Sequence, residues 1–565
     1  MTVTTPESAA DRLAATLDPV VDHVAARREA WTRVDLSERV ALLRRTIDDV
    51  VAVAGDWVKL GCVAKGIDQT SPLAGEEWFS GPLVTVLQLR QMADALEAGA
   101  APRPRRLETR PDGQVVAHVF PAGLREWLVY SRMSVEVWIE PGRPPSQGTL
   151  YRRKAAGERR PGRAALVLGA GNVSSIGPLD VAHKLFAEDE VVVLKMNPVN
   201  EYLAPVFARA FRSLVEPGYL AIVTGGADVG QYLCAHPSID SIHLTGSDRT
   251  HDAIVWGETA EEQEARRVRR EPRLAKHVTS ELGCVTPVLV VPGRWSDADL
   301  TYQARNVASM LANNASFNCN AAKVLVLARG WDQRDAFLDR LHDVLVRLPA
   351  RRAYYPGAEE RYHGFREHYP NARVFGPGGP HVVPWTMIPN VPPDAGEYAL
   401  TREAFCGVLA EVSLDVSDAP SFLRQAVPFV NEHVWGNLSA MLIVDGITGR
   451  RHRAAVEQAI ADLRYGGVAV NVWAGVNFAL GVASWGAYPG NTLDHVRSGI
   501  GFVHNTMFFD YPQKSVVRGP FRMWPTPMWF ADHRNLRELG ERATRFEAHP
   551  SWPAVPSLAL AGLKG

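Results

Sequence analysis

Cysteine is scarce in this sequence, with five residues among 565 and no CxxC pair. An odd number of widely spaced cysteines argues against a disulfide framework and against a structural zinc site. His363 and His368 lie in a segment rich in tyrosine and arginine, where the pattern favours surface histidines. We therefore expect no bound metal, and a chemical role for at least one thiol.

Net charge is also nearly absent, because 61 basic residues face 62 acidic ones for a formal charge of -1. Such a chain has no field that would attract nucleic acid or an anionic membrane. The N-terminal MTVTTPESAADRLAAT lacks a basic region followed by an apolar core, which predicts no signal peptide and a cytoplasmic location. The longest stretch without charge, 465–493, is interrupted by glycines, asparagines and a proline, so we expect a pocket wall there and no transmembrane segment.

The chain is longer than one hydrophobic core can organise, which predicts two or three domains. Apolar residues three and four positions apart predict helices over 11–28, 36–54 and 84–96. SVEVWIEPG and GTLYRRKA, separated by a turn-rich segment, predict a hairpin within 115–155. From Ala164, apolar runs such as ALVLG and EVVVLK alternate with amphipathic helices, which is typical of a parallel, doubly wound sheet.

A second α/β series begins at Thr286 (TPVLVVPG) and continues through AKVLVLARG, SAMLIVDG and VAVNVWAG. Between the two series, the densely charged residues 256–276 predict a solvated helix. Aromatic residues cluster near the C-terminus and predict a wrapping arm, which would seal an oligomer interface or a substrate tunnel.

A glycine-containing strand-to-helix segment, LVLGAGNVSSIG, suggests a phosphate-binding turn at 166–177. Ser174 stands where the usual third glycine would be. The next strand ends in Lys195, at a place where a dinucleotide fold usually has an acid for the ribose. A lysine suits a hydroxyl or a phosphate there.

Several segments, taken in order, resemble the aldehyde dehydrogenase superfamily over roughly 160–480. Asn172 ends an AGN segment that is similar to the family's P-W-N, and Lys195 follows it at the family's interval of 23 positions. IHLTGS, SELGC, SFNCNAAKVLV and REAFCG resemble, in that order, the pyrophosphate, glutamate, nucleophile and nicotinamide-ribose segments. The chain thus looks like a divergent member with an extended C-terminus.

This resemblance implies oxidation of an aldehyde to a carboxylic acid through a covalent thiohemiacetal and thioester on Cys319. Glu281 would be the general base that hydrolyses the thioester, and Asn172 with the backbone N–H of Cys319 would stabilise the oxyanion. It also implies a set of coenzyme-binding residues: Lys195, Gly246, Ser247, Glu403 and Phe405.

The sequence departs from the family pattern at several places. Gly171 replaces a tryptophan, Cys284-Val285 replace Gly-Lys after the glutamate, and Cys406-Gly407 replace Gly-Pro. Pro198 stands where the family has an acid that favours an unphosphorylated ribose, so NAD and NADP are both allowed. Cys284 lies near Glu281 in sequence and is a candidate resolving thiol.

We expect an α/β fold of two doubly wound lobes and a small hairpin that the family uses for subunit pairing, hence a homodimer or homotetramer. The expected domains are coenzyme-binding (1–134 and 158–281), hairpin (135–157), catalytic (282–486) and a C-terminal arm (487–565). Trp473, Phe478 and Trp485 belong either to an apolar substrate pocket or to the core.

Two other functions stay open at this stage. A CoA-acylating aldehyde dehydrogenase or acyl-CoA reductase would use the same cysteine, but Glu281 disfavours it because a thiol acceptor needs no water-activating base. A noncatalytic scaffold is suggested by the altered surroundings of the motifs, and the joint presence of Cys319, Asn172 and Glu281 argues against it.

Overall fold

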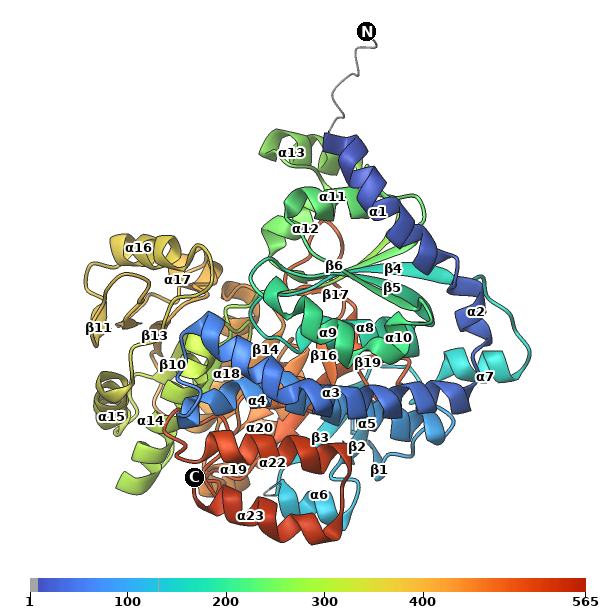
Figure 1. The fold of residues 1–565 in the computed structure, drawn as a ribbon. Helices are drawn as coiled ribbons and strands as arrows, with labels where there is room; N and C mark the ends of the chain where they lie inside the picture. The colour runs from blue at the N-terminus through green and yellow to red at the C-terminus, as the bar shows by residue number, and fades with distance from the viewer. Residues whose placement is uncertain (1–8, 131) are drawn as a thin grey trace.

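The computed structural model of the chain describes residues 9–130 and 132–565. Figure 1 shows β4 (Arg163–Leu168), β5 (Glu190–Lys195) and β6 (Leu220–Val223) above the long helix α3 (Leu36–Lys65), and the C-terminal helices α22 (Leu536–Ala548) and α23 (Val555–Leu563) below it. Two large sheets organise the chain, so the prediction of an α/β fold with parallel sheets is confirmed.

The smaller sheet has the order β17-β8-β7-β4-β5-β6. Its strands from β8 to β6 are parallel, and β17 is antiparallel to β8. The chain proceeds from β4 outward to β6 and then returns to the other side of β4 for β7 and β8, which makes the sheet doubly wound. Its strands are β4 Arg163–Leu168, β5 Glu190–Lys195, β6 Leu220–Val223, β7 Ser241–Gly246, β8 His277–Leu282 and β17 Gly499–Ile500.

The larger sheet has eleven strands in the order β1-β2-β3-β19-β15-β14-β9-β10-β13-β12-β11. Strands β19 to β12 are parallel, while β1 to β3 and β11 add antiparallel edges. The strands are β1 Arg106–Thr109, β2 Val115–Phe120, β3 Ser134–Ile139, β9 Pro287–Val290, β10 Val324–Ala328, β11 Arg373–Phe375, β12 Trp385–Ile388, β13 Val408–Leu414, β14 Ser439–Ile443, β15 Gly467–Val470 and β19 Pro512–Arg518. A separate pair joins β16 Ser484–Gly486 to β18 Phe502–His504.

Strand β5 shows why these segments are parallel strands. All six of its residues are buried, because helices cover both faces of the sheet, and a run such as VVVL can satisfy that environment.

The N-terminal helices agree with the sequence prediction. They are α1 Ala9–Ala25, α2 Arg28–Arg33, α3 Leu36–Lys65 and α5 Val84–Glu97. Helix α3 begins after Asp35, whose side chain accepts a hydrogen bond from the backbone N–H of Glu38, and ends at Gly66 in the left-handed conformation. It passes through the exposed Gly55, where the sequence pattern predicted its end, because a single glycine does not stop an otherwise packed helix.

The hairpin predicted within 135–157 is wrong. Its first half is β3, which pairs with β2 on one edge and with the C-terminal β19 on the other. Its second half is helix α7 Thr149–Ala155, because Tyr151 is buried with its hydroxyl bonded to the carbonyl of Phe186 while basic side chains surround it. Alternation over so few residues does not distinguish a strand from a short helix.

The charged segment 256–276 contains helix α13 Ala260–Arg269, which has no buried residue, as predicted. The other helices are α4 Gly75–Trp78, α6 Leu124–Val129, α8 Ile176–Ala182, α9 Ala204–Ala210, α10 Arg212–Val215, α11 Ala227–Ala235, α12 Asp248–Val255, α14 Asp297–Ala312, α15 Arg334–Arg347, α16 Ala358–His368, α17 Tyr398–Thr401, α18 Ala419–His433, α19 Gly446–Arg451, α20 Arg453–Asp462, α21 Gly475–Ala479, α22 Leu536–Ala548 and α23 Val555–Leu563. Short 3₁₀ or π turns are η1 Pro72–Ala74, η2 Phe79–Leu83, η3 His183–Ala187, η4 Glu201–Leu203, η5 Asn313–Ser316 and η6 Trp552–Ala554. Within 9–130 and 132–565, no helix combines the length and apolarity that crossing a membrane requires.

The C-terminal residues are built into the fold and do not form a separate arm. They supply β17 to the smaller sheet and β19 to the larger one, and α22 packs on α4 and α5. The contact with α4 is close, because a Cβ added at Gly75 would overlap the backbone of Leu536.

This close approach generates a stability prediction. Gly75→Ala should destabilise the protein by about 1–3 kcal/mol, because a methyl group cannot fit without moving α22. Gly55→Ala is the matched control, because Gly55 also lies inside a helix. Nothing lies within 4 Å of a Cβ added at Gly55. Gly55→Ala should stabilise the protein by about 0.5–1 kcal/mol. Thermal and urea unfolding measure both changes, and a Gly75→Ala variant as stable as the wild type would refute the tight contact.

Candidate active site

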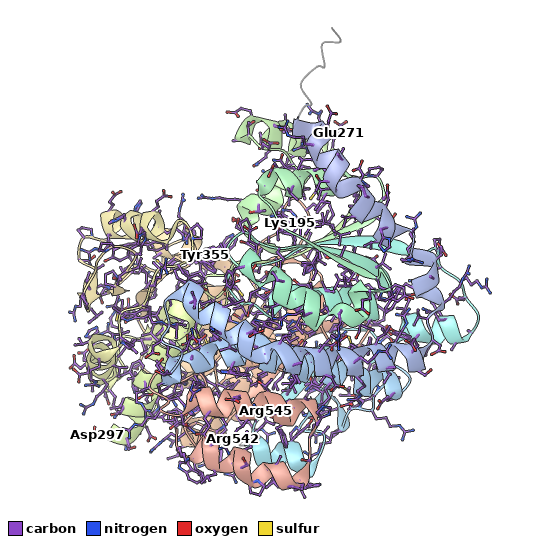
Figure 2. All side chains as sticks on the ribbon, in the orientation of Figure 1. Lys195, Glu271, Asp297, Tyr355, Arg542 and Arg545 are labelled. Carbon is purple, nitrogen blue, oxygen red and sulfur yellow. The ribbon has the colours of Figure 1, made fainter. Side chains whose placement is uncertain are left out.

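A cavity of about 990 Å³ lies between the two lobes, and all eight site residues predicted from the sequence line it: Asn172, Lys195, Gly246, Ser247, Glu281, Cys319, Glu403 and Phe405. Figure 2 marks one residue from each wall, Lys195 at the end of β5 and Tyr355 on the lobe of the larger sheet. Residues far apart in sequence therefore face one space.

The topology of the smaller sheet explains one wall. Asn172, Lys195 and Gly246 follow or end β4, β5 and β7, and Glu281 is next to last in β8. Carboxyl ends of parallel strands meet at one edge of a sheet, and the crevice opens where the winding direction reverses, here between β4 and β7. Ser247 caps α12 by accepting a hydrogen bond from the backbone N–H of Thr250 at 3.1 Å, so the first turn of α12 also points to this edge.

Cys319 belongs to the lobe of the larger sheet. Its side chain lies close to the carboxylate of Glu281, which belongs to the lobe of the smaller sheet. Its Sγ lies 3.8 Å from Oε1 of Glu281 in donor geometry. Burial, followed by the nearby charges of Glu281 and Glu403, raises the pKa of the Cys319 thiol well above its usual value. The sulfur is therefore held as a thiol at neutral pH.

The turn before Cys319 has an unusual backbone. Asn314, Ala315 and Ser316 have φ values of 52°, 54° and 71°, three successive left-handed residues without a glycine. Each costs about 1–2 kcal/mol relative to right-handed backbone, and strain of this kind concentrates at functional sites. Lys323 helps to hold the turn, since its Nζ donates to the carbonyl and the hydroxyl oxygen of Ser316 at 3.2 and 2.7 Å.

The Glu281 side chain is buried from solvent, and one of its two carboxylate oxygens, Oε2, lacks a hydrogen-bond partner among the described residues. Burial, with the charge of Asp180 as the second cause, raises the pKa of Glu281 to about 8. Asp180 lies close because its Oδ2 accepts from the hydroxyl of Thr245 at 3.0 Å, and Thr245 is the cross-strand partner of Glu281.

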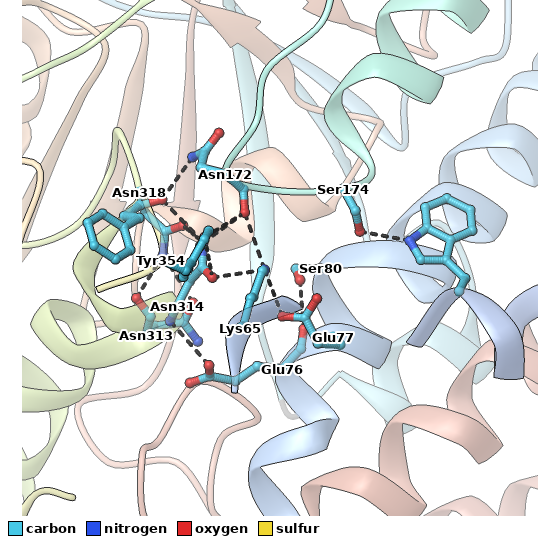
Figure 3. A network of polar contacts seen from close by, with 12 residues as sticks. Lys65, Glu76, Glu77, Ser80, Asn172, Ser174, Asn313, Asn314, Asn318 and Tyr354 are labelled. Carbon is cyan, nitrogen blue, oxygen red and sulfur yellow. Dashed lines mark hydrogen bonds and ion pairs between the residues drawn. The ribbon is translucent and has the colours of Figure 1, made fainter. Parts of the chain in front are cut away.

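Asn172 is tied to the turn that precedes Cys319. Its side-chain Nδ2 donates to the carbonyl of Phe317 at 2.9 Å, which fixes the amide plane. Its own backbone oxygen lies within hydrogen-bond distance of donors on Lys65, Asn314 and Tyr354 (Figure 3).

Glu403 and Phe405 form part of the opposite wall. Burial raises the pKa of Glu403 to about 7, against the opposing effect of Lys323. Its carboxylate rests on Gly283, where an added Cβ would collide with Oε2. Phe405 packs edge-on against Tyr355 at a centroid distance of 5.0 Å. Across the cavity, burial lowers the pKa of Lys195, while Glu201 and Asp228 act in the opposite direction.

Other candidates from the sequence lie outside this cavity wall. Cys284 is buried, with Sγ 3.9 Å from the carbonyl of Ser439, and Trp473 donates to the carbonyl of Asn320 at 3.0 Å. Trp485 is fully buried, and Phe478 packs on it edge-on. Trp473 thus bonds to the segment that carries Cys319, and none of these four residues lines the cavity.

The ring of His368 stacks on the ring of Tyr398, with 3.9 Å between the ring centroids. Across 9–130 and 132–565, no group of three or more His, Cys, Asp or Glu side chains is arranged to hold a metal ion.

Sequence reasoning missed the polar residues that support the site, chiefly the buried Lys65, Asp180, Asn314 and Lys323 and the half-buried Tyr354. They come from separate helices and loops, and no spacing rule connects them. One signal was available: NNASFNC places three polar asparagines at the end of an apolar helix, where buried amides need partners.

Comparison with known proteins agrees with this geometry. The sequence model of the aldehyde dehydrogenase family matches residues 180–356, which include Lys195, Glu281 and Cys319 but not Asn172 or Glu403. The 4-trimethylaminobutyraldehyde dehydrogenase of Homo sapiens is 30% identical over 139 residues, 24% of each chain. Aldehyde dehydrogenase LUC3 of Fusarium sp is 26% identical over 174 residues, 30% of this chain and 34% of that one. These matches span about a quarter to a third of the relatives' length.

Solved structures show the same fold over most of the chain. An NAD-dependent aldehyde dehydrogenase from Sinorhizobium meliloti has a TM-score of 0.60 and 18% identity, covering 92% of this chain and 89% of that one. Lactaldehyde dehydrogenase from Escherichia coli has a TM-score of 0.59 and 18% identity, covering 91% and 92%. An indole-3-acetaldehyde dehydrogenase solved with NAD⁺ has a TM-score of 0.58 and 17% identity, covering 89% of each chain.

The raised pKa of Cys319 predicts slow, pH-dependent alkylation. Without coenzyme, iodoacetamide should modify Cys319 at pH 7.5 at least about tenfold more slowly than a free cysteine, with the rate still rising above pH 9, because only the thiolate reacts. Glu281→Gln should speed the reaction by removing a nearby negative charge, whereas Glu271→Gln on the exposed surface (Figure 2) should not. Mass spectrometry of the peptide that contains Cys319 measures the rate, and modification as fast as that of free cysteine would contradict the raised pKa of the thiol.

Proposed function

From the premise that this chain belongs to the aldehyde dehydrogenase superfamily, we propose that it oxidises an aldehyde to a carboxylic acid with NAD or NADP, through a covalent adduct on Cys319. The observation that carries the proposal is the thiol of Cys319 lying 3.8 Å from the Glu281 carboxylate in a cavity that Asn172 also lines. A nucleophile, a base and an amide donor then share one reaction volume.

The cavity fits a nicotinamide dinucleotide. The first turn of α12 offers backbone N–H groups to a pyrophosphate, and the ammonium of Lys195 suits a ribose hydroxyl or a phosphate. The buried Oε1 of Glu403 has no partner among the described residues and suits a ribose hydroxyl. When bound, the coenzyme supplies the hydride acceptor. Pro198 leaves no carboxylate to repel a 2′-phosphate, so NAD and NADP both stay in the proposal.

The first chemical step joins sulfur to carbon. Glu281 takes the proton from the Cys319 thiol, and the thiolate attacks the aldehyde carbon, so that a C–S bond forms and the carbonyl π electrons move to oxygen. Asn172 Nδ2 has a second hydrogen besides the one donated to Phe317, and with the backbone N–H of Cys319 it stabilises the oxyanion, at roughly 3–4 kcal/mol per donor. A bound nicotinamide would accept the hydride from that carbon, and the group left on Cys319 would then be a thioester.

The second step returns the enzyme to its starting state. The proton taken from the thiol first passes from Glu281 to solvent. Glu281 then accepts a proton from water, the water oxygen attacks the thioester carbon, and the C–S bond breaks to release the acid. The Cys319 thiolate takes this second proton from Glu281, which restores the thiol and the carboxylate. A carboxylate with a pKa of about 8 is a stronger base than an ordinary glutamate once ionised. Burial therefore improves the base, at the cost of keeping much of it protonated at neutral pH.

Self-association as a homodimer or homotetramer stays a prediction that rests on the family resemblance, and a cytoplasmic location stays a prediction that rests on the N-terminal sequence. Strand β3, which the resemblance assigned to subunit pairing, has both of its edges paired within this chain. An oligomer would accordingly form through another surface.

A panel of aldehydes, with each coenzyme and with or without CoA, tests the function. The panel includes lactaldehyde, indole-3-acetaldehyde and 4-trimethylaminobutyraldehyde, which the names of similar proteins suggest. Wild type should give acid and reduced coenzyme without CoA. Cys319→Ala should show no burst of reduced coenzyme, and Glu281→Gln should lower turnover by at least about 100-fold because the thioester persists. Strict dependence on CoA would replace this proposal with an acylating reaction, and a burst unaffected by Cys319→Ala would reject the nucleophile.

The charge of Asp180 predicts the pH dependence of acid release. Turnover should rise with pH through about 8, because Glu281 must be ionised to accept a proton from water. Removing the carboxylate charge of Asp180 lowers the pKa of Glu281, so Asp180→Asn should move this rise to lower pH by about one unit. Asparagine keeps an oxygen for Thr245. Steady-state rates from pH 6 to 9.5 measure the shift, and a rise at the same or higher pH in the variant would be the wrong sign.

A further inference from the structure

Lys65, the last residue of α3, is buried and makes three polar contacts beside the cavity (Figure 3). Its Nζ lies 2.7 Å from Oε1 of Glu77, 3.0 Å from Oδ1 of Asn314 and 3.3 Å from the backbone oxygen of Asn172. An ammonium has three hydrogens, so these contacts use all of its donors. The three acceptors come from α4, from the turn before the nucleophile and from the segment after β4, and the chemical steps above leave Lys65 without a role.

The backbone oxygen of Asn172 is where these segments meet. Besides the contact with Lys65, this oxygen accepts a hydrogen bond from Nδ2 of Asn314 at 3.0 Å, and it lies 3.0 Å from the hydroxyl oxygen of Tyr354. The same hydroxyl is 2.9 Å from Oδ1 of Asn314. The main chain of the proposed oxyanion donor is thus joined to the turn that carries the nucleophile.

The side chain of Asn314 is held at both of its ends. Oδ1 faces Lys65 and Tyr354, and Nδ2 faces the backbone oxygen of Asn172, the carbonyl of Phe317 and the side chain of Asn318. Asn314 is the first of the three left-handed residues, and asparagine tolerates that backbone better than the alanine and serine that follow. The turn is therefore fixed chiefly through one amide.

Helix α4 anchors this arrangement with charge. Glu77 neutralises Lys65, while the neighbouring Glu76 pairs with Arg351 at 2.8 Å and accepts from the backbone N–H of Asn314 at 3.2 Å. Both glutamates are buried. Replacing Lys65 alone would leave the Glu77 carboxylate uncompensated, so a clean test removes both charges.

We propose that Lys65 is a positioning residue for the chemical step: it fastens the Asn172 main chain to the 314–316 turn, so that the amide donor and the Cys319 sulfur keep one relative placement. This inference rests on the proposed function for its effect on rate. Its effect on the backbone is independent of catalysis.

The test compares Lys65→Met/Glu77→Gln with Lys514→Met. Lys514 is an equally buried lysine on β19 that donates to the carbonyls of Ile460, Ala461 and Leu463 at 2.9, 2.8 and 2.7 Å, remote from the cavity wall. The double variant should lower kcat by about 30- to 100-fold, because a misplacement near 1 Å has such an effect, while the KM for coenzyme changes less than about twofold. Lys514→Met should lose thermal stability and keep the wild-type kcat per folded molecule.

Hydrogen–deuterium exchange of the peptides covering 312–323 is the second measurement, and it needs no activity. Exchange there should be faster in the double variant and unchanged in Lys514→Met. If the double variant folds and keeps wild-type exchange in these peptides, or keeps kcat within twofold of an active wild type, the proposal is overturned. If the wild type oxidises no aldehyde, the proposed function fails, while exchange still decides whether Lys65 holds the turn.

Discussion

The site depends on two acidic groups, the half-buried Cys319 thiol and the buried Glu281 carboxyl, lying within 3.8 Å of each other. Neither the Cys319 thiol nor the Glu281 carboxyl ionises easily in that place, since burial is the largest cause of the raised pKa of both. A neutral pair tolerates burial that a charged pair would not. Ionisation of one partner then produces a strong nucleophile or a strong base in a space with little water to weaken it.

Bringing that pair together requires both sheets. Glu281 lies on β8 of the smaller sheet, whereas Cys319 lies between α14 and β10 of the larger one. The boundary between the two is crossed by polar groups: Asn172 bonds to Phe317, and Lys65 bonds to Asn314. The strained turn 314–316 therefore has stabilising contacts in both lobes, from Lys323 in its own lobe and from Lys65 in the other, and the geometry of the site is a property of the joined lobes.

Much of the fold and the site could be predicted from the sequence, because local patterns carry them. Buried parallel strands such as β5 have continuous apolar runs, and a residue at the end of such a strand, such as Lys195, falls at the edge where the cavity opens. The resemblance to one family supplied the residues from the second lobe, Cys319 and Glu403. The structure corrected the hairpin at 135–157, since β3 takes its partner from residues 512–518, and no local pattern reports so distant a pairing. The roles of Lys65 and Asp180 could not be predicted for the same reason, because they depend on contacts between residues far apart in the sequence.

The position of β19 has a consequence for how the chain is made. This strand lies between β15 and β3, so the larger sheet is continuous only once residues 512–518 are present. During synthesis, β3 and β15 leave the ribosome with unpaired edges, and these edges stay unpaired until residues 512–518 have emerged. Exposed edges of buried, apolar strands invite pairing with other chains, so this order of synthesis makes the unfinished protein prone to aggregation and a natural client for chaperones.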